Sequence, residues 1–328
     1  IRWAEVRQLM AGTTSIVGAT YNAGNGGLMR NLDTTPAGQL GNLTGSAGIN
    51  SDTFPLDDTA GGELTSGCGY PTVPVDVPTA SGVAYIPHVA EGIEASAHNE
   101  FVCLTAAKPD GGVGVLSPRT AFVHGVGLTA QDVALMGSQF SSLVWSPRSN
   151  VSLYGDTAQI TLFKHLGVNI AMGTDWTISG SMNMLRELRC ADSLNQARFN
   201  GALSDENLWR IATANGADAT ATTAALGRLA TGRLGDVAIF KRKQGVSFYR
   251  SIIEAEPQDV VMTMRGGRVM YGDANIISQS GASGCDSLNV CGTNKAVCIT
   301  GDVAAITGTN AGTSLSLLQQ GNASTDAL

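Results

Sequence analysis

Two histidines and an aspartate are placed where a sheet could bring them together. His88, His124 and Asp175 each stand at or just beyond the end of a short apolar run, and a glycine-containing turn follows each of them. The carboxyl ends of the strands in a parallel barrel meet on one face, so these side chains would converge on one pocket. Imidazole and carboxylate groups bind divalent first-row metals, and a bound metal can lower the pKa of a water to about 7.

Each of these residues also has a structural interpretation. A single histidine at a strand end is more often a hydrogen-bonded structural residue, and Asp175 could cap the helix that follows it. Three convergent cases favour the chemical interpretation, because they include half of the chain's four histidines. The other two, His98 and His165, fall in predicted helices and are expected at the surface.

Strand-like runs alternate with helical runs over residues 1–215, which is typical of a parallel α/β architecture. The strands are predicted at residues 13–18, 83–88, 120–124, 142–145 and 168–172. The helices are predicted at residues 2–11, from about 93, from about 129, and at 157–166, 183–191 and 205–215. Thr129 and Asp132 have the spacing of a capping box at the start of their helix.

The remaining segments are less regular. Residues 20–80 show weak periodicity, with one candidate strand at 42–47. Residues 54–58 and 70–71 are candidate substrate loops, although ordinary turns explain them equally well. Residues 259–273 predict a β-hairpin that turns at two adjacent glycines, and we expect an irregular tail after it.

Composition excludes some classes of function. The 328 residues, of which 43% are hydrophobic, suffice for one α/β barrel with an appendage. The net charge of −7 and the lack of a basic cluster argue against a nucleic-acid partner. No run approaches the roughly 20 apolar residues of a membrane span. Low charge, abundant small polar residues and a cysteine-bearing tail favour a periplasmic or secreted location slightly over the cytoplasm.

The six cysteines leave two interpretations open. Cys285, Cys291 and Cys298 lie in the polar tail, where a zinc knuckle is disfavoured because the spacing lacks close pairs and a fourth ligand. If the protein is exported, a disulfide within the tail or from the tail to the body is favoured. The alternative of reduced, buried thiols best suits Cys103 and Cys190, which have apolar neighbours in the sequence.

Six sequence blocks follow one another along the chain: PHVAEG, FVHGVGL, SPRSN, GVNIAMGTDW, IATANGADA and LGRLATGRLGDVAIF. In this order they resemble the amidohydrolase superfamily, in the branch that holds chlorohydrolases and cytosine-, guanine- and adenosine-analogue deaminases. The resemblance covers most of residues 1–273. It implies an α/β fold, a (β/α)8 barrel of the TIM type over residues 1–226, with part of a flanking β-sandwich over 227–273. The small, polar composition of residues 274–328 predicts an irregular, cysteine-containing tail.

The resemblance also implies roles for matching residues. His88 and Asp175 would bind one divalent metal ion, zinc in the first place and iron or manganese as alternatives. Glu91 would carry a proton between the attacking water and the leaving group, and His124 would contact the substrate or that water. Asp175 would also accept a proton from the water. The residues implied to shape the substrate pocket are Asn150, as a loop residue, and Trp176, for which a core position is an equal alternative.

The sequence departs from the family pattern before His88. Such enzymes take two further metal ligands from a His-x-His pair on the first barrel strand, and no histidine precedes His88. The sequence begins without a methionine or a signal peptide, within a predicted helix. We therefore expect an upstream segment of the same protein to supply the first strand, the missing ligands and half of the sandwich, and we expect a homo-oligomer.

Three functions follow from these observations. The first is a hydrolase that uses a metal-activated water to cleave a C–N bond other than a peptide bond, or a C–Cl bond, of a small cyclic substrate. The second is a peptidase-like or lactamase-like amidohydrolase, for which a lysine at a strand end would be expected and is not found. The third is a non-catalytic, metal-free binding or scaffold protein.

Overall fold

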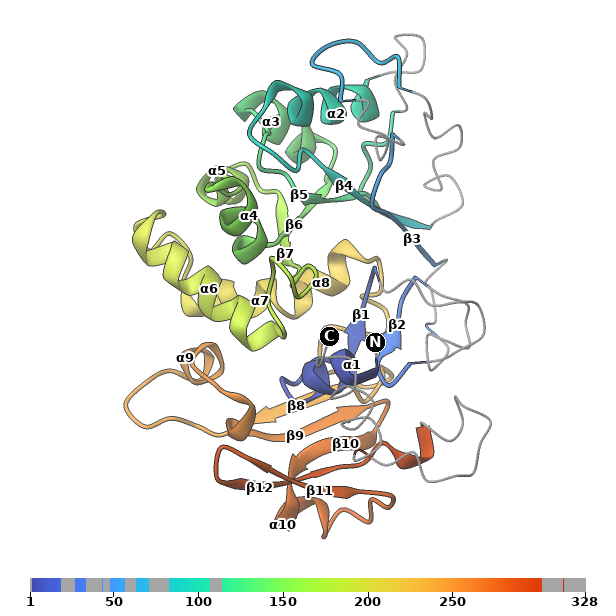
Figure 1. Cartoon of the computed structure of the whole chain (residues 1–328), viewed down its shortest axis with the longest axis vertical. Coiled ribbons are helices and arrows are strands. Elements are labelled where there is room, and N and C mark those ends of the chain that lie inside the picture. Colours follow the sequence, from blue (N-terminus) through green and yellow to red (C-terminus); the bar gives the residue numbers. More distant parts are fainter. Residues whose placement is uncertain are drawn as a thin grey trace, which may run out of the picture. The chain divides into compact units, whose positions relative to one another are not determined.

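The computed structural model describes residues 2–18, 27–33, 43, 48–56, 63–70, 83–106, 114–302 and 315. The chain divides into two compact units, each considered separately below (Figure 1). The parallel-sheet unit comprises Thr44–Ser181 and Arg186–Arg228. The antiparallel-sheet unit comprises Ile1–Leu43, Met182–Leu185 and Leu229–Leu328.

The parallel-sheet unit is built on five strands that pair in the order in which they occur along the chain, and all four pairings are parallel. These strands are β3 (Ile49–Asp52), β4 (Ala84–Val89), β5 (Ala121–His124), β6 (Ser142–Trp145) and β7 (Asn169–Met172). Its helices are α2 (Ala95–Thr105), α3 (Ala130–Ser138), α4 (Pro147–Tyr154), α5 (Ile160–His165), α7 (Asp205–Ile211), α8 (Ala214–Ala219) and most of α6 (Met184–Ala197). Helical crossovers let consecutive strands run parallel, and they leave the strand interiors apolar and buried.

Four of the predicted strands are confirmed within one residue at each end, and so is the capping box, in which Thr129 and Asp132 bond reciprocally at the start of α3. The parallel α/β architecture is therefore confirmed. In the described part of the chain the sheet is open at β3 and β7, and no closed barrel is formed. The candidate strand at 42–47 falls outside the described residues except for Leu43.

Other helix and strand predictions need correction. The strand predicted at 13–18 is the two-residue β1 (Ser15–Ile16), which pairs with β2 (Arg30–Asn31) and does not join the five-stranded parallel sheet. The helix predicted at 157–166 begins only at Ile160, and the helix predicted at 205–215 is divided into α7 and α8. Helix α4 was not predicted, although Pro147 in its first turn is typical of a helix start.

The antiparallel-sheet unit has five strands in the order β11-β12-β10-β9-β8. They are β8 (Val237–Phe240), β9 (Val260–Arg265), β10 (Arg268–Asp273), β11 (Asp286–Val290) and β12 (Thr293–Val297). Helices α1 (Arg2–Leu9), α9 (Phe248–Ile253) and α10 (Ala274–Ile277) and a 3-10 turn at Pro257–Asp259 complete it. Val6 and Leu9 of α1 are buried in one cluster with Tyr271 of β10.

Two hairpins shape this sheet. The predicted β9–β10 hairpin is confirmed, and Gly266 and Gly267 both have the positive φ that a two-residue turn of type I′ requires. The tail was expected to be irregular, but β11 and β12 form a second hairpin that extends the sheet beside β10. Its turn also has two positive φ angles, at Cys291 and Gly292. The turn escaped prediction because cysteine is an unusual residue at such a position.

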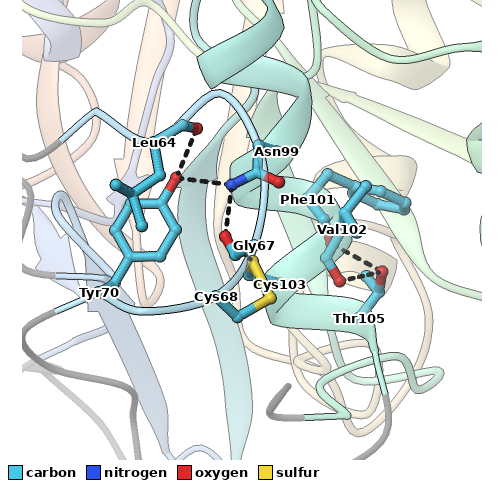
Figure 2. The surroundings of a disulfide bond; sticks show 9 residues. All are labelled: Leu64, Gly67, Cys68, Tyr70, Asn99, Phe101, Val102, Cys103 and Thr105. Carbon is cyan, nitrogen blue, oxygen red and sulfur yellow. Dashed lines mark hydrogen bonds between the residues drawn. A yellow bond between two sulfur atoms is a disulfide. The ribbon is translucent and has the colours of Figure 1, made fainter. Parts of the chain in front are cut away.

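A disulfide between Cys68 and Cys103 ties a loop to α2 (Figure 2). Hydrogen bonds reinforce the attachment, since the Asn99 amide donates to the carbonyl of Gly67 at 2.9 Å and to the hydroxyl of Tyr70 at 3.2 Å. The interpretation of Cys103 as a reduced thiol is therefore wrong. The pairing depends on a loop that folds back over a helix from 35 residues away, which local sequence does not reveal.

The tail disulfide and the free Cys190 agree with the sequence-based interpretation. Cys285 and Cys298 form a disulfide within the tail, one of the two arrangements expected there. Cys190 is a free, partly buried thiol, and Cys291 is free and exposed. Among the helices that the structure describes, none has the length and apolar character needed to cross a membrane.

Candidate active site

The parallel-sheet unit brings four of the predicted residues to the carboxyl ends of its strands. His88 is the last residue but one of β4, and Glu91 follows two residues after that strand. His124 is the final residue of β5, and Asp175 lies three residues beyond β7. Because the strands are parallel, these positions share one edge of the sheet.

The side chains are close enough to act together. The Nε2 atom of His124 lies 3.2 Å from Oε2 of Glu91. One potential ligand atom each from Glu91, His124 and Asp175 lies within 4.8 Å of the others. The rings of His88 and His124 have centroids 5.1 Å apart.

Left-handed backbone conformations accompany the site. His124 (φ 74°), Asp175 (φ 55°) and Ala90 (φ 54°) are three of the seven non-glycine residues with positive φ among the described residues. Such a conformation costs roughly 1–2 kcal/mol for a residue with a Cβ atom. Strain of this kind collects at functional sites, where the surrounding structure holds it in place.

His124 is fully buried and its ring is held from one side. Its Nδ1 atom lies 3.1 Å from the amide nitrogen of Asn150, on α4. The amide oxygen of Asn150 accepts from the hydroxyl of Thr157 at 3.3 Å, and that hydroxyl accepts from the indole N–H of Trp145 at 2.8 Å. Asn150 is therefore a buried helical residue beside His124, and its predicted loop position is wrong.

Glu91 is held in its ionised form. Its Oε1 atom accepts a hydrogen bond from the Tyr154 hydroxyl at 3.1 Å. Burial raises the pKa of Glu91, but the hydrogen bond and electrostatic contact with His124, the electrostatic interaction with the His88 ring and the bond from Tyr154 outweigh burial, so the pKa is lowered. An ionised carboxylate at this position can accept a proton.

His88 is held as a neutral ring with one free nitrogen. Burial and the nearby His124 lower the pKa of His88, which favours its uncharged form. Its Nδ1 atom lies 3.1 Å from the backbone carbonyl oxygen of Asp52. A carbonyl only accepts, so Nδ1 carries the proton and Nε2 keeps the lone pair that a metal requires.

The donor set fits a divalent metal ion. The buried Nε2 atom of His124 has no aligned hydrogen-bond partner among the described residues, although Glu91 lies close to it. The carboxylates of Glu91 and Asp175 lie close to His124, and the His88 ring centroid is 5.1 Å from that of His124. Imidazole with carboxylate is a common ligand set for zinc. The cluster found from ligand distances contains His124 rather than His88, so the choice of ligands stays a prediction.

A sequence model of the amidohydrolase family matches residues 80–270, which is more than half of the chain. The chain belongs to the amidohydrolase family. The resemblance that the six blocks carried is thereby confirmed.

Known amidohydrolases with similar sequences are deaminases. The 5-methylthioadenosine/S-adenosylhomocysteine deaminase of Syntrophobacter fumaroxidans is 29% identical over 181 residues, covering 51% of this chain and 40% of that protein. The 5'-deoxyadenosine deaminase of Methanothermobacter thermautotrophicus is 28% identical over 173 residues, covering 50% of this chain and 40% of that protein. The chain therefore spans less than half the length of these relatives, whose names agree with the predicted branch of the family.

Solved structures show the same fold. An adenosine deaminase from Xanthomonas campestris with bound zinc superposes with a TM-score of 0.51 at 22% identity, over 58% of this chain and 46% of that chain. A triazine hydrolase variant superposes with a TM-score of 0.50 at 20% identity, over 59% of this chain and 44% of that chain.

The remaining site predictions have mixed outcomes. Trp176 is 62% exposed, so it is not a core aromatic, and its place in the pocket wall stays a prediction. Tyr70 is buried beside the disulfide, and Phe54 is half exposed just after β3. Asp57, Asp58 and Pro71 lie outside the described residues. His165 is exposed, as predicted, and His98 pairs with Asp132 at 3.0 Å.

Sequence reasoning missed three residues that support the amidohydrolase site. Asp52 ends the short, polar strand β3, which carries no periodic signal. Tyr154 follows Asn150 by one helical turn on α4, a spacing that would have identified it had that helix been predicted. Thr157 precedes α5 and contacts Asn150 through its side chain.

A buried carboxyl group supports the loop that carries Asp175. Arg148 donates its backbone N–H to Oε1 of Glu187 at 2.9 Å and its Nε–H to the hydroxyl of Ser181 at 2.8 Å. Glu187 is fully buried. Burial raises its pKa to about 7, although the hydrogen bonds from Arg148 and Ser181 act to lower it.

Proposed function

We propose that the protein to which this chain belongs is a metal-dependent hydrolase that removes an amino group from a small cyclic substrate by cleaving a C–N bond other than a peptide bond. One observation carries the proposal: ligand atoms of Glu91, His124 and Asp175 lie within 4.8 Å of one another at the strand ends of an amidohydrolase. The relatives named above are deaminases of adenosine compounds, which supports an amino group on an aromatic ring as the leaving group.

A divalent metal ion, zinc in the first place, would be held by His88 and Asp175 and would supply a strong nucleophile from water at neutral pH. Glu91, with its lowered pKa, would take a proton from the attacking water and deliver it to the leaving nitrogen. Tyr154 occupies Oε1 of Glu91, which directs proton transfer to Oε2, on the side of His124. His124 would hydrogen-bond the substrate, and Asn150 would hold its ring.

We also propose that the five parallel strands belong to a (β/α)8 barrel and that the antiparallel strands belong to a flanking β-sandwich. The greater length of the relatives supports a longer protein, in which further residues would complete the barrel and supply other ligands. The homo-oligomer stays a prediction. The two disulfides support the proposed location outside the cytoplasm, because disulfides are rare in reducing compartments.

Metal analysis of the full-length protein is the first test. After expression with zinc, iron and manganese, we expect close to one equivalent of metal per subunit. Less than about a tenth of an equivalent would refute the proposal, because the deprotonated ligands of a true site hold metal at neutral pH.

Replacement of the predicted proton carrier is the second test. Glu91→Gln should keep the metal and lower the rate of ammonia release from adenosine-type substrates by roughly 10²–10⁴-fold. Glu206→Gln, a change of a partly buried side chain on α7, is the matched control and should leave the rate unaltered. Full turnover by Glu91→Gln would show that another group carries the proton.

A further inference from the structure

The hydrogen bonds behind His124 determine which of its two ring nitrogens carries the proton. Trp145, Thr157, Asn150 and His124 form a chain with donor–acceptor distances of 2.8, 3.3 and 3.1 Å. Each of the four residues is at most 1% exposed, so water does not compete for these bonds. We propose that Thr157 is a positioning residue that holds His124 in the tautomer with its proton on Nε2.

The direction of the chain begins at Trp145. An indole nitrogen only donates, so the Thr157 oxygen must accept the bond from Trp145. The hydroxyl hydrogen of Thr157 is then free to be donated, and the neighbouring side-chain oxygen of Asn150 accepts it.

This bond fixes the orientation of the Asn150 amide. With its oxygen toward Thr157, the amide turns its NH₂ group toward Nδ1 of His124. An NH₂ group only donates, so Nδ1 must offer a lone pair, and the single proton of the neutral ring is on Nε2.

The opposite orientation of the Asn150 side-chain amide is disfavoured. If the Asn150 amide were flipped, its NH₂ group would face the Thr157 oxygen, and the Thr157 hydrogen would have no acceptor among the described residues. A buried donor without a partner costs more free energy than a typical hydrogen bond supplies. The Nε2 lone pair of His124 would also face Oε2 of Glu91 at 3.2 Å, which is repulsive for an ionised carboxylate.

The two histidines of the site are therefore held in opposite tautomers. The carbonyl of Asp52 places the proton of His88 on Nδ1 and leaves Nε2 as a ligand atom. The Thr157–Asn150 pair places the proton of His124 on Nε2, as a donor beside Glu91. The use of that donor toward a substrate rests on the proposed function, whereas the tautomer rests on the hydrogen bonds alone.

Nitrogen-15 NMR of the imidazole rings tests the assignment on the metal-free full-length protein, without any activity assay. Single His→Gln variants at positions 88 and 124 assign the signals of these two histidines. At about pH 8, above the ordinary histidine pKa, we expect His124 protonated on Nε2 and His88 on Nδ1. A wild-type His124 with its proton on Nδ1, or on both nitrogens, would overturn the proposal.

Variants of Thr157 test its positioning role. Thr157→Val keeps the shape but removes the hydroxyl, so the Asn150 amide can flip and the two nitrogen shifts of His124 should move toward each other. Thr157→Ser should restore the wild-type pattern, and His88 should not change in either variant. Wild-type shifts for His124 in a folded Thr157→Val protein would refute the role of Thr157. If that variant does not fold, the wild-type and Thr157→Ser spectra still decide the tautomer. A failure to bind metal would refute the proposed function and leave this result intact.

Discussion

Glu187 should make the chain less stable as the pH rises. This buried carboxyl group has a pKa of about 7 in the folded protein, against an ordinary value of 4.5. Between these two pH values the native protein holds a proton that the unfolded chain has released. Stability from this group is therefore fully present below about pH 4.5 and is lost as the pH rises through about 7.

The size of the effect follows from the two pKa values. A difference of one pKa unit is worth about 1.4 kcal/mol, so the change from 4.5 to about 7 corresponds to about 3 kcal/mol. Glu187→Gln resembles the protonated acid at every pH, and its amide oxygen can still accept the backbone N–H of Arg148. We therefore expect the variant to match the wild type near pH 4.5 and to exceed its unfolding free energy by about 3 kcal/mol near pH 8.

Urea unfolding followed by tryptophan fluorescence measures this difference. Three of the four tryptophans, Trp145, Trp176 and Trp209, lie in the same unit as Glu187. Glu206→Gln is the control, because the Glu206 side chain is only partly buried and pairs with Arg210 on the same helix. The control should not alter the pH dependence between about pH 5 and 8, apart from a few tenths of a kcal/mol overall.

Two results would refute this reasoning. If wild type and Glu187→Gln show the same pH dependence of unfolding, Glu187 does not hold a proton at neutral pH. If Glu187→Gln is less stable than the wild type at about pH 8, the ionised carboxylate stabilises the fold through Arg148, and burial is not the dominant influence on its pKa.

Three further changes test the local structure by urea unfolding. Thr129→Ala removes the side-chain cap of α3 and should cost about 1 kcal/mol, whereas Thr129→Ser should be nearly neutral. Replacement of both Cys68 and Cys103 by alanine should cost about 4 kcal/mol from the 35-residue separation of this disulfide, and equal stability of the double variant and the wild type would contradict the link. Gly180→Ala would place a Cβ atom against the carbonyl of Thr174 and should destabilise by about 1–3 kcal/mol, whereas Gly216→Ala on α8 meets open space and should stabilise by about 0.5–1 kcal/mol.

The sequence predicted the part of the fold in which local pattern and tertiary environment agree. The strands at β4 to β7 are short apolar runs that stay buried on both faces, so composition alone locates them. Their ends then locate His88, His124 and Asp175, because parallel strands share one direction. The capping box at Thr129 was predictable for a similar reason, since both partners are three residues apart.

The missed features depend on contacts between distant segments. Strand β3 is short, three of its four residues are polar, and it is a strand because it pairs with β4. The partner of Cys103 comes from a loop whose course the sequence does not reveal. Helix α4 was not predicted because SPRSN was interpreted as a loop. Tyr154 was missed for the same reason, since its contact with Glu91 depends on the helical turn.

The left-handed residues of the site limit how the protein can be improved by selection. At position 90 a glycine would relieve the backbone without removing a reactive group, so a thermostability screen could accept it freely. At positions 124 and 175 the same exchange would relieve the backbone by discarding the imidazole or the carboxylate. A library selected only for heat resistance would therefore tend to lose the imidazole and the carboxylate of the site while keeping the fold. Positions 124 and 175 should be kept constant from the first round of such a selection.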